Sequence, residues 1–297
     1  MTTSRHFTRT SNPSASARLI VMICFAMIAF AANSLLCRLA LKHTDVDAAS
    51  FSVVRLVSGA LVLWLMCVVR RSTTSIKGSW KGATALFIYV FAFSFAYHHL
   101  ETGTGALLLF GAVQLSMVLY GLFKGERMHG LAIVGFVLAL IGLVSLLLPG
   151  AAAPDPLSAL TMLLSGLAWG VYSLLGKGVA DPLATTAGNF IRSIPLVLIA
   201  SLPFLLGLRW DPLGILYAVL SGALASGVGY AAWYVAVRHL ASFQAATWQL
   251  SVPILASLAG IVFLGESLSV RMVLASVAVL GGVALVLGGK YGSATGS

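Results

Sequence analysis

The chain alternates long apolar segments with short polar connections along almost its whole length. The first residues are polar, with Arg5 and Arg9 among Ser and Thr, and Arg18 then opens an uninterrupted apolar run that is too long for a signal peptide. Since a bilayer-spanning helix takes about 20 apolar residues, the hydropathy pattern predicts ten of them. They are expected near residues 19–41, 48–69, 79–98, 103–123, 130–148, 157–176, 183–206, 213–237, 242–263 and 270–288.

The composition excludes a water-soluble protein. Of the 297 residues, 59% are hydrophobic and 9% are charged, whereas soluble domains are about half apolar and about a quarter charged. Ten helices of about 20 residues leave room only for a tail and short turns, so we expect an all-α membrane protein without a separate soluble domain. Cys24, Cys37 and Cys67 lie inside apolar stretches, which argues against a disulfide framework.

The positive charge indicates a membrane topology. The formal net charge is +10, but the basic residues lie between apolar segments and form no nucleic-acid groove. With ten spans both termini share one face, which carries Arg5, Arg9, Arg18, Arg70, Arg71, Lys77, Lys81, Lys124, Arg127, Lys177, Arg238 and Lys290. The other face carries Arg38, Lys42, Arg209 and Arg271. Because cytoplasmic loops collect Lys and Arg, we expect a multi-pass protein of the bacterial cytoplasmic (inner) membrane with both termini in the cytoplasm.

The two halves of the chain repeat one another. With an offset of 140 residues, Gly125-Glu126 falls on Gly265-Glu266 and Gly82 on Gly222, and with small gaps Arg55 matches Arg192. Five helices per half is an odd number, so the second half enters the membrane from the opposite face, as in the inverted repeats of secondary transporters. We expect a cytoplasmic tail (1–18), two repeats (19–150 and 151–290) around a central cavity, and a flexible tail (291–297).

The matched pieces carry a family resemblance. Arg55 with Arg192, and Leu264-Gly265-Glu266-Ser267-Leu268 with Lys124-Gly125-Glu126-Arg127, resemble the paired EamA repeats of the drug/metabolite transporter superfamily, over residues 19–288. Trp169-Gly170-Val171-Tyr172 and Gly229-Tyr230-Ala231-Ala232-Trp233 are similar to the YddG-type aromatic amino-acid exporters. The resemblance implies ten helices in two inverted five-helix repeats and export of amino acids or related metabolites. Val113 stands where the second repeat has Pro253.

The sequence offers little for catalysis. All eight carboxylates fall in loops or at span ends, and no P-loop is present, so neither a carboxylate proton relay in the bilayer nor direct ATP coupling is expected. We predict no enzyme activity, cofactor or metal. His98 and His99 are candidates for coupling to protons, or are simple surface groups. An intramembrane enzyme would need a cluster such as His43, Asp45 and Asp47, which is a thin basis for one.

Arg55 and Arg192 are the only charged residues well inside predicted spans. An intramembrane charge is a functional hypothesis by default, and its partner here would be a substrate carboxylate. The alternative is a structural role, in which each arginine extends to the interface or bonds to a carbonyl group. The structural role is favoured, because repeat-equivalent residues tend to have equivalent roles.

Uncharged polar and aromatic side chains within the spans form the main candidate site. Amide and phenol groups would be unsatisfied against lipid, so they should face an internal cavity. The predicted substrate-binding residues are Asn33, Tyr97, His98, Gln114, Trp169, Tyr172, Tyr230, Tyr234, Trp248 and Gln249. Interfacial belts or helix contacts are the alternative roles. Pro195 and Pro253 are expected to act as hinges.

A cavity of rings and amides suits an uncharged or zwitterionic solute with a flat or apolar side chain. We therefore predict a secondary transporter that exports amino acids, with another cargo such as a drug, nucleobase or sugar derivative as the alternative. Glycines four apart, at Gly121 and Gly125 and at Gly166 and Gly170, can serve a dimer interface. Packing within a monomer is the favoured interpretation.

Overall fold

The computed structural model describes residues 13–70, 76–125, 130–148, 153–176, 178–207, 209–237, 240 and 248–292, and these residues contain helices and no strand. The first five helices are α1 (Pro13–His43), α2 (Ala48–Val69), α3 (Trp80–Ala96), α4 (Thr102–Phe123) and α5 (Leu131–Leu147). Next come α6 (Pro156–Leu175), α7 (Pro182–Ser201), the 3₁₀ turn η1 (Leu202–Gly207) and α8 (Pro212–Val219). A π-helical segment η2 (Leu220–Val228), α9 (Gly229–Val237), α11 (Ser251–Leu264) and α12 (Val270–Gly292) complete the order.

Seven helices of the described chain are long and apolar enough to cross a membrane, counting α7–η1 and α8–η2–α9 as one each. Three further apolar helices, α3, α5 and α11, are shorter, with 17, 17 and 14 residues. The all-helical class is thus confirmed, while ten membrane spans stay a prediction. Part of the ninth predicted span, residues 242–247, lies outside the described residues.

Several boundaries differ from the predicted ones, among them the end of α12, which runs to Gly292 and so into the expected tail. α1 begins at Pro13 and not at residue 19, inside the segment expected to be a tail. Proline suits the first turn of a helix because it has no N–H group to leave unpaired there. α11 begins at Ser251, with Pro253 in its first turn, directly after the helical residues Trp248 and Gln249, and a hinge at Pro253 stays a prediction. Pro195 does lie inside α7, as expected.

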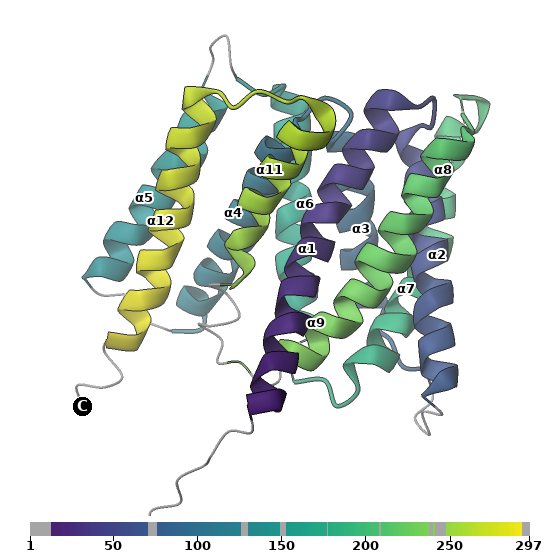
Figure 1. The fold of residues 1–297 in the computed structure, drawn as a ribbon, viewed down its shortest axis with the longest axis horizontal. Coiled ribbons are helices and arrows are strands. Elements are labelled where there is room, and N and C mark those ends of the chain that lie inside the picture. The colour runs from purple at the N-terminus through teal and green to yellow at the C-terminus, as the bar shows by residue number, and fades with distance from the viewer. Residues whose placement is uncertain are drawn as a thin grey trace, which may run out of the picture.

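The helices run alongside one another, and the beginning of α1 and the end of α12 lie at the same end of the bundle (Figure 1). Contacts between helices repeat when the two halves are exchanged: α4 packs on α6 as α11 packs on α1, and α3 packs on α7 as η2 packs on α2. The halves are therefore packed against each other symmetrically. Gly166 and Gly170 serve the α4–α6 contact within the monomer, where a Cβ atom would meet Leu109 and Ser116.

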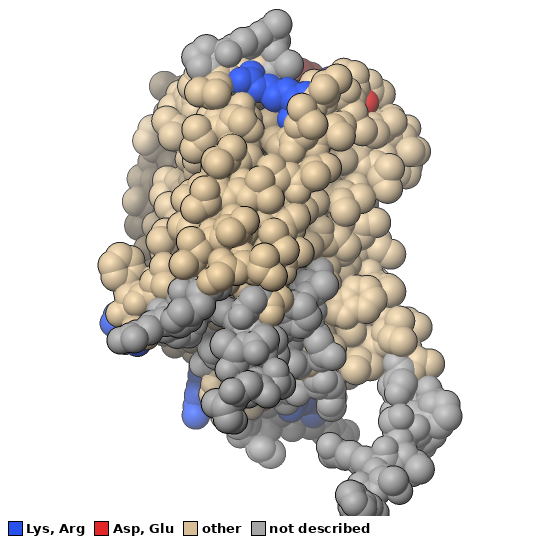
Figure 2. All heavy atoms as spheres, turned by 90° about the vertical axis from the view of Figure 1, so that its left-hand side faces the viewer, with Lys and Arg blue, Asp and Glu red and all other residues tan. Residues whose placement is uncertain are grey.

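Apolar side chains cover the outside of the bundle. Val21, Leu61 and Val262 are more than half exposed, at 67%, 55% and 73%, and Figure 2 shows Lys and Arg atoms near the two ends of the visible face, with a broad uncharged surface between them. An apolar exterior of this extent is suited to contact with lipid and not with water.

The last helices of the two halves pack on each other through glycine. A Cβ atom on Gly282 of α12 would lie 2.5 Å from the carbonyl oxygen of Gly135 on α5. Along the same interface Gly142 faces Ala278, so the residue numbers rise on one helix as they fall on the other. α5 and α12 are therefore antiparallel, and close approach of their backbones substitutes for the hydrophobic effect, which is missing between helices in lipid.

We expect Gly282→Ala to destabilise the protein by about 1 to 3 kcal/mol, because the added methyl group collides with backbone and not with a flexible side chain. Gly281→Ala is the matched control, since no atom lies within 4 Å of the place its Cβ would take. Thermal unfolding in detergent measures both. Equal melting temperatures for the two variants would contradict the packing described here.

Candidate functional site

A small pocket lies at the centre of the bundle, enclosed by aromatic rings from both halves of the chain. Its lining comprises Phe30 and Asn33 on α1, Tyr89 and Phe93 on α3, Leu109 and Phe110 on α4, Trp169 on α6 and Tyr230 on α9. The Trp169 ring contacts rings on two other helices: its centroid lies 4.7 Å from that of Tyr89 and 5.0 Å from that of Tyr230. Phe30 adds edge-to-face contacts with Trp169 and Tyr230. These rings meet in the geometry that aromatic pairs prefer.

The π-helical segment η2 anchors the amide of Asn33 at this pocket. The hydroxyl groups of Ser221 and Ser226 donate to Asn33 Oδ1 over 2.8 and 3.2 Å. Residues five apart lie on well-separated faces of an α-helix, and the wider π turn brings them closer to one face. The π segment therefore lets two serines of one helix hold a single amide of α1.

Arg55 of α2 lies directly behind the pocket and is fully buried. Its Nη2–H group donates to the Tyr89 hydroxyl over 3.0 Å, and its guanidinium carbon lies 4.8 Å from the centroid of the Phe93 ring. Arg192 has a different environment: it is half-buried, and its Nη1–H group donates to the Gly188 carbonyl of its own helix over 3.3 Å. The two repeat-equivalent arginines thus have unequal surroundings.

A second pocket lies toward the end of the bundle where α3 begins. Its lining includes Ser79, Tyr172, Thr186, Asn189 and Tyr234. Tyr172 borders this pocket together with Thr186, Asn189 and Tyr234, and Asn189 Oδ1 accepts from the backbone N–H of Ser79 over 2.9 Å. Polar groups of α3, α6, α7 and α9 therefore meet here.

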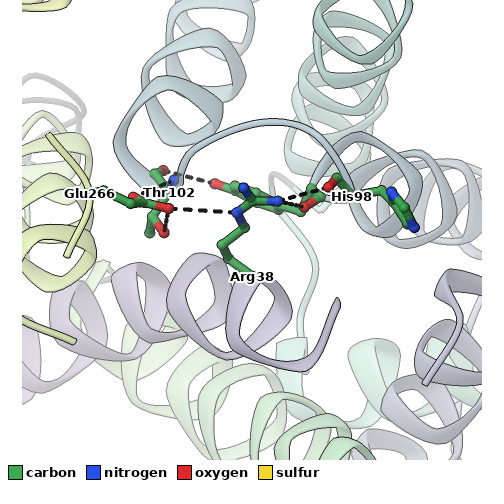
Figure 3. A network of polar contacts seen from close by, with 5 residues as sticks. Arg38, His98, Thr102 and Glu266 are labelled. Carbon is green, nitrogen blue, oxygen red and sulfur yellow. Dashed lines mark hydrogen bonds and ion pairs between the residues drawn. The ribbon is translucent and has the colours of Figure 1, made fainter. Parts of the chain in front are cut away.

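The opposite end of α3 is closed by a polar network between the two halves (Figure 3). Arg38 of α1 donates from Nη1 to the carbonyl oxygens of Tyr97 and His98 over 2.9 and 2.8 Å, at the end of α3. Its Nε atom lies 3.6 Å from Oε1 of Glu266. The Glu266 carboxylate accepts from the backbone N–H and the hydroxyl of Thr102 over 2.8 and 3.1 Å, at the start of α4.

The charges in this network match the helix ends that they contact. A cation is favourable at the carbonyl end of a helix and an anion at the N–H end, so Arg38 satisfies the end of α3 and Glu266 the beginning of α4. Gly265 makes the position of Glu266 possible, since its φ of 63° ends α11 in the left-handed conformation. Gly125 ends α4 in the same way, with φ of 88°, so this glycine match between the repeats has a structural reason.

Two segments of the chain, residues 17–148 and 156–288, match the EamA-like transporter family. The chain belongs to this family. Together the segments cover most of the sequence and include every residue of the central pocket and of the network at the end of α3.

Relatives of this EamA transporter include several proteins of bacteria and archaea. It is 56% identical over 278 residues to the uncharacterized protein PA1977 of Pseudomonas aeruginosa, covering 93% of this chain and 97% of that protein. It is 26% identical to an uncharacterized transporter of Archaeoglobus fulgidus, over 70% of this chain and 79% of that one. A probable terminal-alkyne amino-acid exporter of Streptantibioticus cattleyicolor is 28% identical over 62% of this chain and 64% of its own length.

One solved structure, described as the crystal structure of a protein, has the same fold. It aligns with a TM-score of 0.66 at 18% identity, over 95% of this chain and 99% of the other. At this identity the likeness concerns the fold alone.

The transporter brings only some of the predicted site residues together. Asn33, Trp169 and Tyr230 line the central pocket, and Tyr172 and Tyr234 line the second one. The others lie elsewhere.

Tyr97 is buried, and its hydroxyl donates to the Thr102 carbonyl, so it belongs to the closed end of the bundle. His98 is exposed and contributes its backbone to that end. Partial desolvation of its ring, and then the charges of His99 and Arg38, lower the pKa of His98 and so favour the neutral imidazole. Gln114 is buried on α4, and its Nε2 atom has no partner among the described residues. Trp248 is exposed and Gln249 half-buried; the structure puts neither in the two pockets.

Sequence reasoning missed several lining residues, above all Phe30, Tyr89 and Phe93. A phenylalanine within a membrane helix carries no signal that separates cavity from lipid contact. Tyr89 does carry one, because it lies in the middle of the predicted span 79–98, far from either interface. It could have been found by the criterion that selected Trp169.

The ion pair between Arg38 and Glu266 should be strongly coupled, since the two side chains are only 10% and 6% exposed. We expect Arg38→Gln and Glu266→Gln each to lose about 3 kcal/mol, and the double variant to lose much less than the sum. The exposed pair Arg70–Asp181, 3.2 Å apart, is the comparison, with a coupling energy of at most about 1 kcal/mol. Unfolding of all variants in mixed micelles gives both coupling energies. Strictly additive losses for the first pair would refute the coupling.

Glu101, next to this network, should weaken the protein at neutral pH. Desolvation and the nearby Glu266 carboxylate raise the pKa of Glu101, against the opposing charges of Arg38 and Lys42. A raised pKa means that the folded state favours the protonated acid, so stability falls as the pH rises through that value. Glu101→Gln should therefore raise the melting temperature at pH 7 and leave it unchanged near pH 4. The exposed Asp45→Asn serves as the control for a lost surface charge.

Proposed function

We propose that this EamA transporter exports amino acids, aromatic or of broad specificity, and related small metabolites across the cytoplasmic membrane by alternating access. The observation that carries the proposal is the central pocket, to which both family-matched segments contribute: six lining residues come from the first and two from the second. A site between two repeats is where a secondary transporter holds its substrate.

The chemistry of the pocket supports an amphipathic solute. Five helices contribute aromatic rings, and Asn33, Tyr89 and Tyr230 contribute an amide and two hydroxyl groups. Sites for small molecules combine a mainly apolar lining with a few placed polar groups. An amino acid with a flat or apolar side chain fits this division. The name of the relative from Streptantibioticus cattleyicolor, a probable terminal-alkyne amino-acid exporter, supports the same class of cargo.

The two ends of the bundle support alternating access. Arg38 and Glu266 join α1 of the first segment to the connection after α11 of the second, and so close one end. The second pocket, which Ser79 lines, lies toward the other end of α3. In our proposal the halves are inverted repeats that rock about the central pocket, and export requires the contacts of Arg38 with Glu266 to open. The end that carries both termini, with more Lys and Arg, would face the cytoplasm.

Flux in liposomes tests this proposal. Purified protein should move radiolabelled phenylalanine faster than empty vesicles do, and Trp169→Ala should reduce the rate about tenfold or more because it removes the central ring of the pocket. Trp64→Ala is the matched control: Trp64 lies in the second half of α2 and is 42% exposed, against 8% for Trp169. Its flux should equal that of the unaltered protein.

The same vesicles distinguish the alternatives. An imposed pH gradient that changes the rate indicates proton coupling, and competition by unlabelled drugs, nucleobases or sugar derivatives identifies another cargo. Absence of flux for every amino acid tested would refute amino-acid export.

A further inference from the structure

The strongest unexplained feature of the molecule is the charge of Arg55. Arg55 is 0% exposed and lies about two turns after the start of α2. A guanidinium group stays protonated in proteins, so Arg55 cannot escape the penalty of burial by losing its proton. Burying an unpaired charge is costly both in protein interiors and in membranes. A counter-charge is therefore expected.

The described part of the chain supplies none. Its two ion pairs are Arg38–Glu266 and Arg70–Asp181, and neither involves Arg55. The contacts of the guanidinium are neutral: the Tyr89 hydroxyl at 3.0 Å, the Ser226 hydroxyl at 3.4 Å, and the ring faces of Tyr89 and Phe93. Nη1 of Arg55 is buried and makes no hydrogen bond to the described residues.

The groups that contact this charge are also groups of the central pocket. Tyr89 and Phe93 line it, and Ser226 connects Arg55 to the pocket residue Asn33 by accepting from Arg55 Nε and donating to Asn33 Oδ1. Tyr230 lines the same pocket, and the rings of Tyr89 and Tyr230 both lie against that of Trp169, with centroids 4.7 and 5.0 Å away. The positive charge thus lies one side chain away from the space that the solute would occupy.

We infer that the central pocket selects solutes with a carboxylate, and that the missing counter-charge of Arg55 is the carboxylate of the transported solute. This inference rests on the proposed transport function and specifies its substrate class. The hydroxyl groups of Tyr89 and Tyr230 hold the carboxylate, and the adjacent guanidinium strengthens these hydrogen bonds by its charge. The apolar part of the solute lies against Trp169 and Phe30. Arg55 acts as a positioning residue, because it works through Tyr89.

The unequal environments of the two repeat-equivalent arginines agree with this role. A solute has one carboxylate, so one arginine is needed, and Arg192 bonds to its own helix instead. Arg192→Gln is therefore a matched control that removes an equal charge from the equivalent place in the other half.

The test compares three probes that share a phenyl ring: phenylalanine, phenylpropionate, which has only the carboxylate, and phenethylamine, which has only the amine. Equilibrium dialysis against the full-length protein in nanodiscs gives each Kd. Phenylalanine and phenylpropionate should bind at least about tenfold more tightly than phenethylamine. Arg55→Gln should abolish this difference, mainly by weakening the binding of phenylalanine and phenylpropionate. Arg192→Gln should preserve the difference.

A ratio between probes separates recognition from damage to the fold, because a merely structural loss weakens all three probes alike. If Arg55→Gln does not fold, Arg55→Lys is measured in its place. It keeps the charge and should retain a smaller preference for the probes that carry a carboxylate. An unchanged preference in Arg55→Gln, or equal binding of all three probes to the unaltered protein, would overturn the inference. If phenylalanine flux is present in liposomes in that case, the transport function stands and only the role of Arg55 fails.

Discussion

Hydrocarbon offers no partner for a hydrogen bond, and this constraint organises the polar groups of the molecule. The outer surface is apolar, with residues such as Val21 and Leu61 exposed, while buried polar groups are paired inside the bundle. Asn33 receives two serine hydroxyl groups, and the ends of α3 and α4 receive Arg38 and Glu266. Departures from such pairing are therefore informative. The clearest are Nη1 of Arg55 and Nε2 of Gln114, both buried without a partner in the described chain.

The packing of the helices is similar in the two halves of the chain, whereas the placement of charged and aromatic side chains is not. The helices of the two halves pack on one another in a pattern that survives exchange of the halves, and glycines at equivalent places end α4 and α11 with positive φ. The charged and aromatic side chains break that symmetry. Arg55 has Tyr89 and Phe93 around it, whereas Arg192 bonds to its own helix. A pseudo-symmetric frame suits motion between two related conformations, and an asymmetric lining suits a solute whose two ends differ.

The contact between Arg38 and Glu266 combines two roles. Each side chain satisfies a helix end that would otherwise leave unpaired backbone groups in a nonpolar region, and together they connect the two halves of the chain. Because water has little access to the ion pair, the attraction between its charges is strong. Separating the pair leaves each charge buried without a partner, which costs free energy. Water entering that end of the bundle would lower the penalty. A closed end held by such a pair can therefore be stable and still open in a hydrated state.

The fold class and much of the helical framework follow from local sequence patterns. Hydropathy decides which segments form membrane helices, because the periodic apolar content needed for burial in lipid is local information. The match of Gly125 with Gly265 at a fixed offset also indicated the repeat. The sequence indicated Asn33, Trp169 and Tyr230 as pocket residues, since amide, indole and phenol groups in the middle of a span lack hydrogen-bond partners in lipid and so face the inside of the bundle.

Which polar groups meet depends on the three-dimensional packing of the helices. Tyr97 lies at the end of α3 next to Thr102, Tyr89 and Phe30 line the pocket, and Arg55 and Arg192 have different surroundings. These outcomes depend on the rotation of each helix about its axis and on the π segment in η2. Both are set by contacts such as that between Gly222 and the Arg55 carbonyl, 167 residues away in the chain, which the local pattern of apolar and polar residues does not encode.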